Sequence, residues 1–235
     1  MNRHDKLSER PILIALSGGI GAGKSVVSRM LRAMGYEVYD CDLNARRIID
    51  SDVAIIESIA REVCEEAVIE GRIDRRRLAE CVFADAEALA RLNAITHRAV
   101  LDDISAWAES QAGKNWPMDD SSESRLPGVI FVETAILTES GLDSMVDQAW
   151  IVTAPEQVRI ERVMKRNGMS RQEVEARIRN QSDRLPLGIP IHMIFNDGSE
   201  SLIARINVLL SNYMDWMLPA GCEQERRIKK RRIKR

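Results

Sequence analysis

The sequence predicts an α/β protein with a three-layer fold, in which helices cover both faces of a parallel central sheet of about five strands. First, a short apolar run at 11–16 passes through a glycine-rich loop into an amphipathic stretch at 24–34, the strand–loop–helix order of such a sheet. Second, short apolar runs of strand length recur later in the chain. Third, 235 residues that are 45% hydrophobic suffice for one substantial core and an inserted subdomain.

The first elements can be placed from local patterns. The run at 11–16 is expected to be a strand, because it is apolar and ends at a Ser-Gly-Gly turn. Helical spacing predicts a helix over 24–34, with Gly35 at its C-terminal cap. The apolar residues with this spacing are Val26, Val27, Met30, Leu31 and Met34. A second strand is expected at 36–39, ending in an Asp-Cys-Asp triplet.

The middle of the chain is predicted to be helical. Residues 43 to about 112 lack clear strand alternation, and the stretches 74–81 and 86–101 carry apolar residues three and four positions apart. Residues 113–128 are rich in turn formers and polar groups, so we interpret them as a surface loop.

The last part of the chain predicts further strands and helices. Strands are expected at 129–132, 148–152 and 193–195. A helix should begin at 153–155, with Pro155 in its first turn, and stop near Gly168. Capping-box spacing at 170–173 predicts the start of another helix. A final helix has one apolar face made of Leu202, Ile206, Leu209, Leu210 and Tyr213.

Charge and hydropathy exclude several classes of protein. The net charge of −2 gives no overall basic field, so we do not expect a nucleic-acid-binding protein. Apolar runs are far shorter than the ~20 residues that cross a membrane, and the N-terminus lacks the apolar core of a signal peptide. We therefore expect a soluble, cytoplasmic protein. The tail at 226–235 is strongly basic and is expected to be disordered.

The cysteines suggest neither a zinc site nor a disulfide framework. The four cysteines, at 41, 64, 81 and 222, form no C-x-x-C pair, and the three histidines are scattered. We therefore expect free thiols that are buried or chemically neutral.

The glycine-rich loop carries the strongest functional signal. Residues 18–25 fit the Walker A pattern G-x-x-x-x-G-K-[ST], in which glycines bring backbone N–H groups onto phosphate oxygens. Lys24 would reach the β- and γ-phosphates, and the Ser25 hydroxyl would ligate Mg²⁺. The residues expected to bind ATP here are Gly19, Ile20, Gly21, Ala22, Gly23, Lys24, Ser25 and Val26. The alternative is a flexible loop that matches by chance, and the flanking strand and helix argue against it.

Other features favour a small-molecule kinase over an ATPase motor or a GTPase. The strand that could supply a Walker B motif ends in Glu133 without a preceding aspartate, and the G-domain motif N-K-x-D is absent. A kinase also needs an acceptor base. Asp40 and Asp42 follow the second strand at the carboxyl edge, where ligands bind in open α/β folds. The alternative for Asp42 is that it caps the helix beginning at Leu43.

An arginine-rich segment is a candidate lid. Arg159, Arg162 and Arg166 lie on one helical face, and Arg171 and Arg177 follow a break at Asn167-Gly168. Such a pair of helices could close over phosphates and exclude water. The alternative is a solvated charged surface, in which neighbouring glutamates pair with the arginines; charge pattern alone favours this alternative.

Three segments resemble the dephospho-CoA kinase family. They are LSGGIGAGKSVVSRMLRAMGYEVYDCDLNAR at 16–46, the helical segment at 71–100, and the strands and arginine-rich segment at 132–181. The resemblance covers about residues 12–215. The chain departs from the family pattern at Arg98, where proline is frequent, and at Thr134-Ala135, where Pro-Leu is frequent.

The resemblance implies the transfer of the ATP γ-phosphate to the ribose 3′-hydroxyl of dephospho-CoA, with Mg²⁺ as cofactor. It implies that Asp42 orients or deprotonates the hydroxyl and that Lys24 and Arg166 act at the transferred phosphoryl group. It also implies that Asn196 lies near the adenine of ATP. Arg46 and His97 would contact the acceptor, although a packed helical histidine is an equal alternative for His97.

The resemblance also implies a single kinase unit over 1–235. The P-loop core would comprise 11–54 and 128–215, with a helical acceptor subdomain and loop at 55–127, a lid at 158–190 and a basic tail at 223–235. The rivals are another small P-loop kinase with a different acceptor, and a nucleotide-gated protein that binds nucleic acid through the tail. The sequence leaves a homo-oligomer open.

Overall fold

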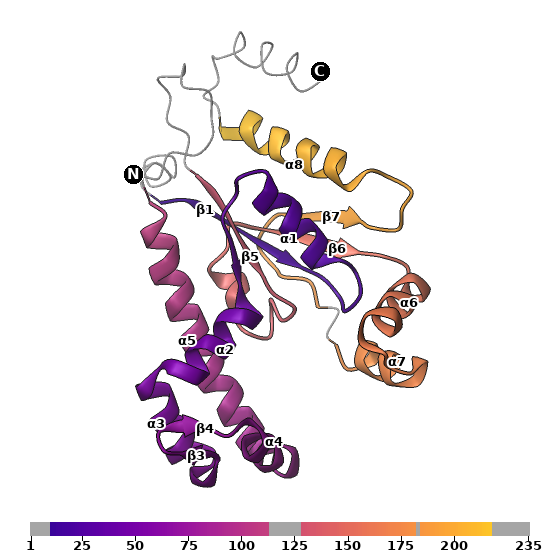
Figure 1. The fold of residues 1–235 in the computed structure, drawn as a ribbon. Coiled ribbons are helices and arrows are strands. Elements are labelled where there is room, and N and C mark those ends of the chain that lie inside the picture. Colours follow the sequence, from indigo (N-terminus) through magenta and orange to yellow (C-terminus); the bar gives the residue numbers. More distant parts are fainter. Residues whose placement is uncertain (1–9, 113–127, 182–183, 218–235) are drawn as a thin grey trace.

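The structure is a computed structural model that describes residues 10–112, 128–181 and 184–217 (Figure 1). The basic tail, and the predicted surface loop except for its last residue, lie outside the described residues. The fold is an α/β arrangement with helices on both faces of a central sheet, as predicted.

The central sheet has five strands in the order β2-β5-β1-β6-β7, and each pair of neighbours is parallel. The strands are β1 (Ile12–Ser17), β2 (Val38–Asp40), β5 (Val129–Glu133), β6 (Gln148–Thr153) and β7 (Ile191–Phe195). All five strands were predicted, to within about two residues at each end. Because the strands are parallel, their carboxyl ends lie at one edge of the sheet, where β1 leads into the glycine-rich loop and β2 ends at Asp40.

Side chains of β1 point alternately to the two faces of the sheet, where they pack against different helices. Ile12, Ile14 and Leu16 pack with α1 (Lys24–Ala33) and α8 (Leu202–Met217) on one face. Leu13 and Ala15 pack with α2 (Cys41–Ser51) and α5 (Ala86–Ser110) on the other face. Both sides of the strand are therefore buried, which explains its unbroken apolar sequence. Over the described residues, no helix combines the length and the apolarity that a bilayer crossing requires.

A small helical subdomain projects from the second layer at the lower left of Figure 1. It consists of α3 (Val53–Glu62), the 3₁₀ turn η1 (Glu65–Ala67), a hairpin and α4 (Arg75–Ala84), packed against the first half of α5. The hairpin strands are β3 (Val68–Ile69) and β4 (Arg72–Ile73). The purely helical prediction for this region was wrong at the hairpin, because strands of two residues are too short to show alternation.

The expectation of free thiols was also wrong for two of the cysteines. Cys64 and Cys81 form a disulfide bond between the end of α3 and α4. Their Cα atoms lie 6.4 Å apart, a separation that a disulfide spans. The sequence separation of 17 residues gives no indication of this contact, because it depends on how α4 packs beside η1. Cys41 is buried and free, as predicted.

A pair of helices, α6 (Glu156–Asn167) and α7 (Arg171–Arg179), lies beside the sheet at the right of Figure 1. The predicted break is confirmed, because α6 ends at Asn167 with Gly168 as its left-handed C-cap, and α7 begins with the capping box of Ser170 and Glu173. Pro155 is the N-cap of α6 rather than a residue of its first turn. This difference is one residue at a helix boundary.

Candidate active site

The glycine-rich loop connects β1 to α1 at the carboxyl edge of the sheet. Gly18 and Gly23 have φ angles of 143° and 102°. A Cβ atom at Gly18 would collide with the carbonyl oxygen of Val152, and one at Gly23 would collide with the side-chain amide of Asn196. Glycine is therefore required here by both the backbone conformation and the space available. The loop leads directly into the N-terminus of α1, which favours bound anions.

Lys24, the first residue of α1, is held inside the loop. Its Nζ atom donates a hydrogen bond to the carbonyl oxygen of Gly18 at 2.6 Å. Burial lowers the pKa of Lys24, while the nearby carboxylates of Glu133 and Asp42 raise it. This half-desolvated ammonium group therefore lies close to carboxylates from the ends of β5 and the start of α2.

The two aspartates after β2 have different roles. Asp40 is the N-cap of α2, and its Oδ1 atom accepts a hydrogen bond from the backbone N–H of Leu43 at 2.9 Å. The alternative that Asp42 caps this helix was therefore wrong. Asp42 lies in the first turn of α2, is exposed, and lines two neighbouring cavities. Its carboxylate is thus available to a ligand.

The larger cavity has a volume of about 770 Å³ and contains the glycine-rich loop. It brings together most of the predicted site residues: Gly19, Ile20, Gly21, Gly23, Lys24, Ser25, Val26, Asp42, Arg46 and Arg166. Ala22 belongs to the same loop, but its side chain is buried and does not line the cavity. Asn196 lies against the loop as well, and its Nδ2 atom donates a hydrogen bond to the carbonyl oxygen of Ala22 at 2.8 Å.

Three arginines of α6 and α7 line this cavity. Arg162, Arg166 and Arg177 line it, and one buried guanidinium nitrogen of Arg162, Nη1, has no hydrogen-bond partner. Arg159 donates from Nε to the carbonyl oxygen of Ile20 at 2.9 Å. Charge pattern alone favoured a solvated surface with glutamate partners. Among these arginines that pairing is present at Arg171, whose Nε atom lies 2.8 Å from Glu175.

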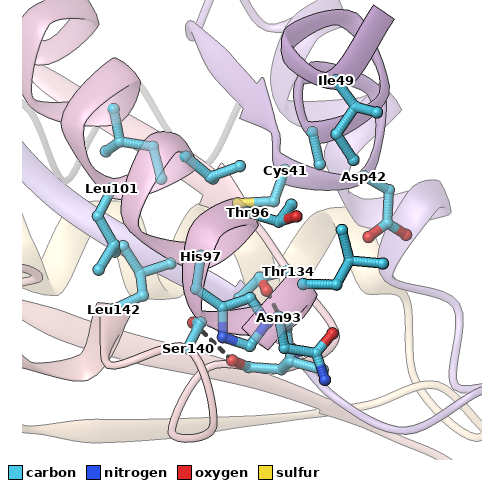
Figure 2. Close-up of a pocket in the computed structure, with 15 residues that line it drawn as sticks. Cys41, Asp42, Ile49, Asn93, Thr96, His97, Leu101, Thr134, Ser140 and Leu142 are labelled. Atoms are coloured by element: carbon cyan, nitrogen blue, oxygen red, sulfur yellow. Dashed lines mark hydrogen bonds between the residues drawn. The ribbon is translucent and has the colours of Figure 1, made fainter. Parts of the chain in front are cut away.

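The smaller cavity has a volume of about 230 Å³ and lies between α2, α5 and the segment after β5 (Figure 2). Its walls are mainly apolar, with polar groups from Asn93, Thr96 and His97. Burial lowers the pKa of His97, and the charge of Glu139 partly opposes this. His97 and Arg46 were both assigned to the acceptor side, but they line different cavities.

The two cavities meet at Asp42 and Thr134, which line both of them. Thr134 is buried at the end of β5, and its Oγ1 atom accepts a hydrogen bond from the backbone N–H of Ile136 at 3.1 Å. A reactant bound at the glycine-rich loop and another bound in the smaller cavity would therefore face each other across Asp42.

The sequence reasoning missed Gln181, which follows α7. Its Oε1 atom accepts a hydrogen bond from the backbone N–H of Ile20 at 2.7 Å, and its Nε2 atom donates to the carbonyl oxygen of Ala135 at 3.4 Å. The side chain therefore links the exit of the arginine-bearing helices to the glycine-rich loop. A single glutamine after a helix has no sequence signature, so no pattern could have revealed it.

Comparisons with known proteins agree with this geometry. A sequence model of the family described as dephospho-CoA kinase matches residues 12–187. A dephospho-CoA kinase of Carboxydothermus hydrogenoformans is 34% identical over 217 residues, which cover 87% of this chain and 96% of the relative. A dephospho-CoA kinase of Thermus thermophilus is 37% identical over 174 residues, covering 74% of this chain and 77% of the relative.

Solved structures share this fold. The crystal structure of TT1252 from Thermus thermophilus has a TM-score of 0.66 and 32% identity, and the match covers 86% of this chain and 98% of that chain. The dephospho-CoA kinase of Campylobacter jejuni has the same fold at 20% identity, with a TM-score of 0.56 and coverage of 84% and 96%. With the phosphate-binding loop, the arginines and the second cavity in one site, this chain belongs to the dephospho-CoA kinase family.

Proposed function

We propose that this chain transfers the γ-phosphate of ATP to the ribose 3′-hydroxyl of dephospho-CoA, giving CoA and ADP, the last step of CoA synthesis. The observation that carries the proposal is the junction of two cavities at Asp42, one with a phosphate-binding loop and one with mainly apolar walls. This arrangement suits a reaction between a nucleoside triphosphate and a second, partly apolar substrate. The family relationship supplies the identity of both substrates.

The triphosphate of ATP would lie in the glycine-rich loop, against the backbone N–H groups and the N-terminus of α1. Lys24 would exchange its hydrogen bond to the Gly18 carbonyl for one to a phosphate oxygen, which is a stronger, charge-assisted partner. Asn196 holds the loop through the carbonyl oxygen of Ala22, and we place the adenine of ATP beside it.

The acceptor hydroxyl would lie at Asp42. The carboxylate accepts the proton of the 3′-hydroxyl as its oxygen attacks the γ-phosphorus and the bond to ADP breaks. Part of the acceptor would occupy the smaller cavity beside His97, and Arg46 on α2 would attract the anionic part of the molecule. The lowered pKa of His97 indicates a neutral imidazole at pH 7, which can donate and accept hydrogen bonds but does not supply charge.

The arginines would stabilise the phosphoryl group during transfer. Arg166 and its cavity neighbours Arg162 and Arg177 can spread over the equatorial oxygens, and the unpartnered nitrogen of Arg162 is suited to an anion. An arginine in this role accelerates phosphoryl transfer by about 10³-fold or more. Closure of α6 and α7 would exclude water and so prevent hydrolysis of ATP.

Oxygen donors in the larger cavity fit a magnesium ion. The Ser25 hydroxyl and the carboxylates of Asp42 and Glu133 line this cavity, and Mg²⁺ prefers such ligands together with phosphate oxygens. When bound, Mg²⁺ neutralises charge on the phosphate oxygens. In this proposal Ser25 is its protein ligand beside ATP.

We also propose the division into a core of 11–54 and 128–215, an acceptor subdomain of 55–127, and a lid of 158–190. A cytoplasmic location, a homo-oligomer and the role of the tail at 223–235 stay predictions. Binding of nucleic acid by this tail would appear as salt-sensitive binding that is lost when the tail is deleted.

The proposal is tested by incubating the protein with Mg²⁺·ATP and a panel of acceptors, followed by mass spectrometry. Dephospho-CoA should gain one phosphate at its 3′-hydroxyl, while nucleoside monophosphates and shikimate should stay unmodified. Lys24→Ala should lose this activity and keep the circular dichroism spectrum of the folded protein. Efficient phosphorylation of another acceptor, with dephospho-CoA unchanged, would contradict the proposal.

A further inference from the structure

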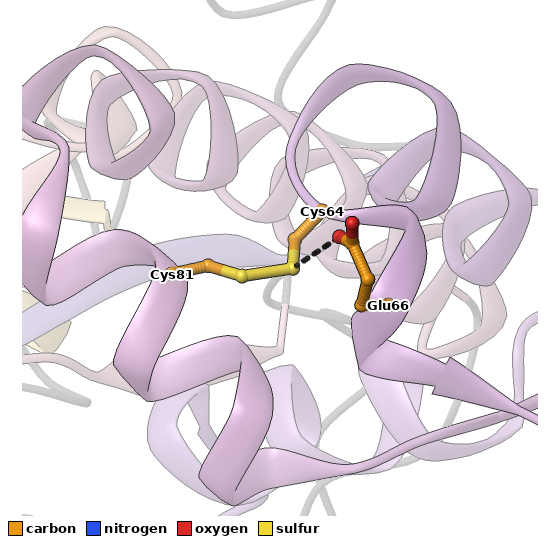
Figure 3. Close-up of side chains that lie close together, drawn as sticks. All are labelled: Cys64, Glu66 and Cys81. Carbon is orange, nitrogen blue, oxygen red and sulfur yellow. Dashed lines mark hydrogen bonds between the residues drawn. A yellow bond between two sulfur atoms is a disulfide. The ribbon is translucent and has the colours of Figure 1, made fainter.

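The acceptor subdomain contains a group of side chains that the proposed reaction does not use. Cys64, Glu66 and Cys81 lie together where the end of α3 and the turn η1 pack beside α4 (Figure 3). The two sulfur atoms are bonded in this structure, and the Glu66 carboxylate lies 3.6 Å from the sulfur of Cys64. Cys64 is 5% exposed, whereas Cys81 is half-buried and Glu66 is exposed.

We propose that Cys64 and Cys81 are a redox modification site: a reversible thiol–disulfide couple that low-molecular-weight disulfides close and low-molecular-weight thiols open. The Cα separation of 6.4 Å means that the subdomain can hold the bond without moving its backbone. In the open form both thiols would stay in contact, since both side chains belong to one apolar cluster with Ile59 and Leu78. The site is therefore built for both states.

The exposure of the two cysteines determines the order of the steps. The more accessible Cys81, as its thiolate, attacks an external disulfide, forms a mixed disulfide and releases one external thiol. Cys64 then attacks the Cys81 sulfur, closes the bond and releases the second external thiol. Two protein thiols are oxidised and one external disulfide is reduced to two thiols. The proton of each thiol passes to solvent, and the negative charge of Glu66 beside Cys64 disfavours the thiolate of that residue.

The couple is connected to the smaller cavity. Ile49 and Leu92 pack against the apolar cluster that contains both cysteines, and the same two side chains line the cavity beside His97. Closing the disulfide restrains α4 relative to the end of α3 and so restrains these two walls. The consequence for the enzyme rests on the proposed function: oxidation should change the KM for dephospho-CoA and leave the KM for ATP unchanged.

To test the proposal, the full chain is equilibrated in mixtures of reduced and oxidised glutathione. Its free thiols are then alkylated, and the peptides are analysed by mass spectrometry. The expected result is a Cys64–Cys81 cross-link that forms in the oxidised mixtures, reverses with reduced glutathione, and raises the melting temperature by roughly 5–10 °C. Cys81→Ser should abolish the cross-link, and Cys222→Ser, outside the described residues, should leave it unchanged. Glu66→Gln removes the negative charge beside Cys64 and should speed closure, because the thiolate is the attacking form.

Three results would overturn the proposal. The first is that both Cys64 and Cys81 are still alkylated after equilibration in the most oxidised mixture, which would show that they remain free thiols. The second is a stable glutathione adduct on either cysteine without the cross-link. The third is binding of one equivalent of Zn²⁺ by the reduced pair with Glu66 that blocks oxidation, because a metal site would then be the resting state. A failed dephospho-CoA assay with an intact cross-link would refute the proposed function and leave the redox site standing.

Discussion

At the scale of single residues, Asp42 is the side chain on which the reaction depends most. It lies at the junction of the two cavities, and it is free because Asp40 caps α2. Asp42→Asn keeps the size of the side chain and removes the proton acceptor. We therefore expect kcat to fall by roughly 10²- to 10⁴-fold, while the KM for ATP changes little. Steady-state kinetics with dephospho-CoA would measure both quantities.

The neighbouring aspartate provides the matched control for this prediction. Asp40→Asn removes the same charge two positions earlier, and asparagine remains a good N-cap for α2. This variant should keep its kcat within a few-fold. Equal losses in both variants would indicate a general electrostatic effect and would remove Asp42 from its role as base.

Gln181 acts on the reaction through the glycine-rich loop, so it is a positioning residue. Gln181→Ala removes the acceptor for the Ile20 N–H and the donor to the Ala135 carbonyl. The 2.7 Å hydrogen bond to Ile20 contributes about 1 kcal/mol and the 3.4 Å bond to Ala135 contributes less, so the KM for ATP should rise roughly five- to tenfold, with a smaller change in kcat. Gln157→Ala is the control, because this side chain contacts Glu161 and Arg171, within the lid. An unchanged KM for ATP in Gln181→Ala would show that the loop holds its shape without the glutamine.

At the scale of elements, a hydrogen-bond network centred on Asp103 joins β2, α2 and α5. The carboxylate of Asp103 accepts hydrogen bonds from the hydroxyl of Tyr39 at 2.6 Å and from the guanidinium of Arg47 at 2.7 Å. Burial raises the pKa of Asp103, but the two hydrogen bonds outweigh it and the pKa is lowered overall. Ionised Asp103 therefore stabilises the junction of these three elements.

The sign of the shift gives a pH dependence. A carboxyl group whose folded-state pKa is below its unfolded value of ~3.9 stabilises the protein above that value, and loses this effect as the pH falls through the folded-state pKa. Asp103→Asn should therefore lower the free energy of unfolding by about 1–2 kcal/mol at pH 7, with a smaller difference as the pH falls below ~4. Urea denaturation of the unmodified protein and of Asp103→Asn across this pH range would measure the difference in their free energies of unfolding. A difference that does not depend on pH would mean that the charge of Asp103 is irrelevant.

Most of the helices and strands could be predicted from the sequence, whereas contacts between distant segments could not. The order of strands and helices and the phosphate-binding loop follow from apolar periodicity and from a short motif, both of which are local in the chain. The hairpin of β3 and β4 was missed because two-residue strands have no periodicity. The partners of Gln181 and the Cys64–Cys81 bond were missed because they join segments separated by many residues. The sequence alone could not tell which of Asp40 and Asp42 is the N-cap of α2. The path of the backbone after β2 makes Asp40 the N-cap.

At the scale of the whole molecule, the apolar residues fall into separate clusters. The central sheet has one cluster on each face, whereas the α3–α4 subdomain and the α6–α7 pair each have a small cluster of their own. Less apolar surface is buried in each of the two small clusters. Local opening of these units should therefore cost less free energy than opening of the sheet.

Hydrogen exchange measured by mass spectrometry, with the protein under reducing conditions, would detect this hierarchy. Amides of β1, β5 and β6 should exchange with the global free energy of unfolding, and those of α4 and α7 at lower values. A non-hydrolysable ATP analogue should slow exchange in α1, α6 and α7, and dephospho-CoA should slow exchange in α5, because α1, α6 and α7 line the larger cavity alone and α5 lines the smaller cavity alone. If either ligand alone protected all of these helices equally, the two cavities would behave as one cooperative unit. The two substrates would then not bind as independent ligands in two cavities that meet at Asp42.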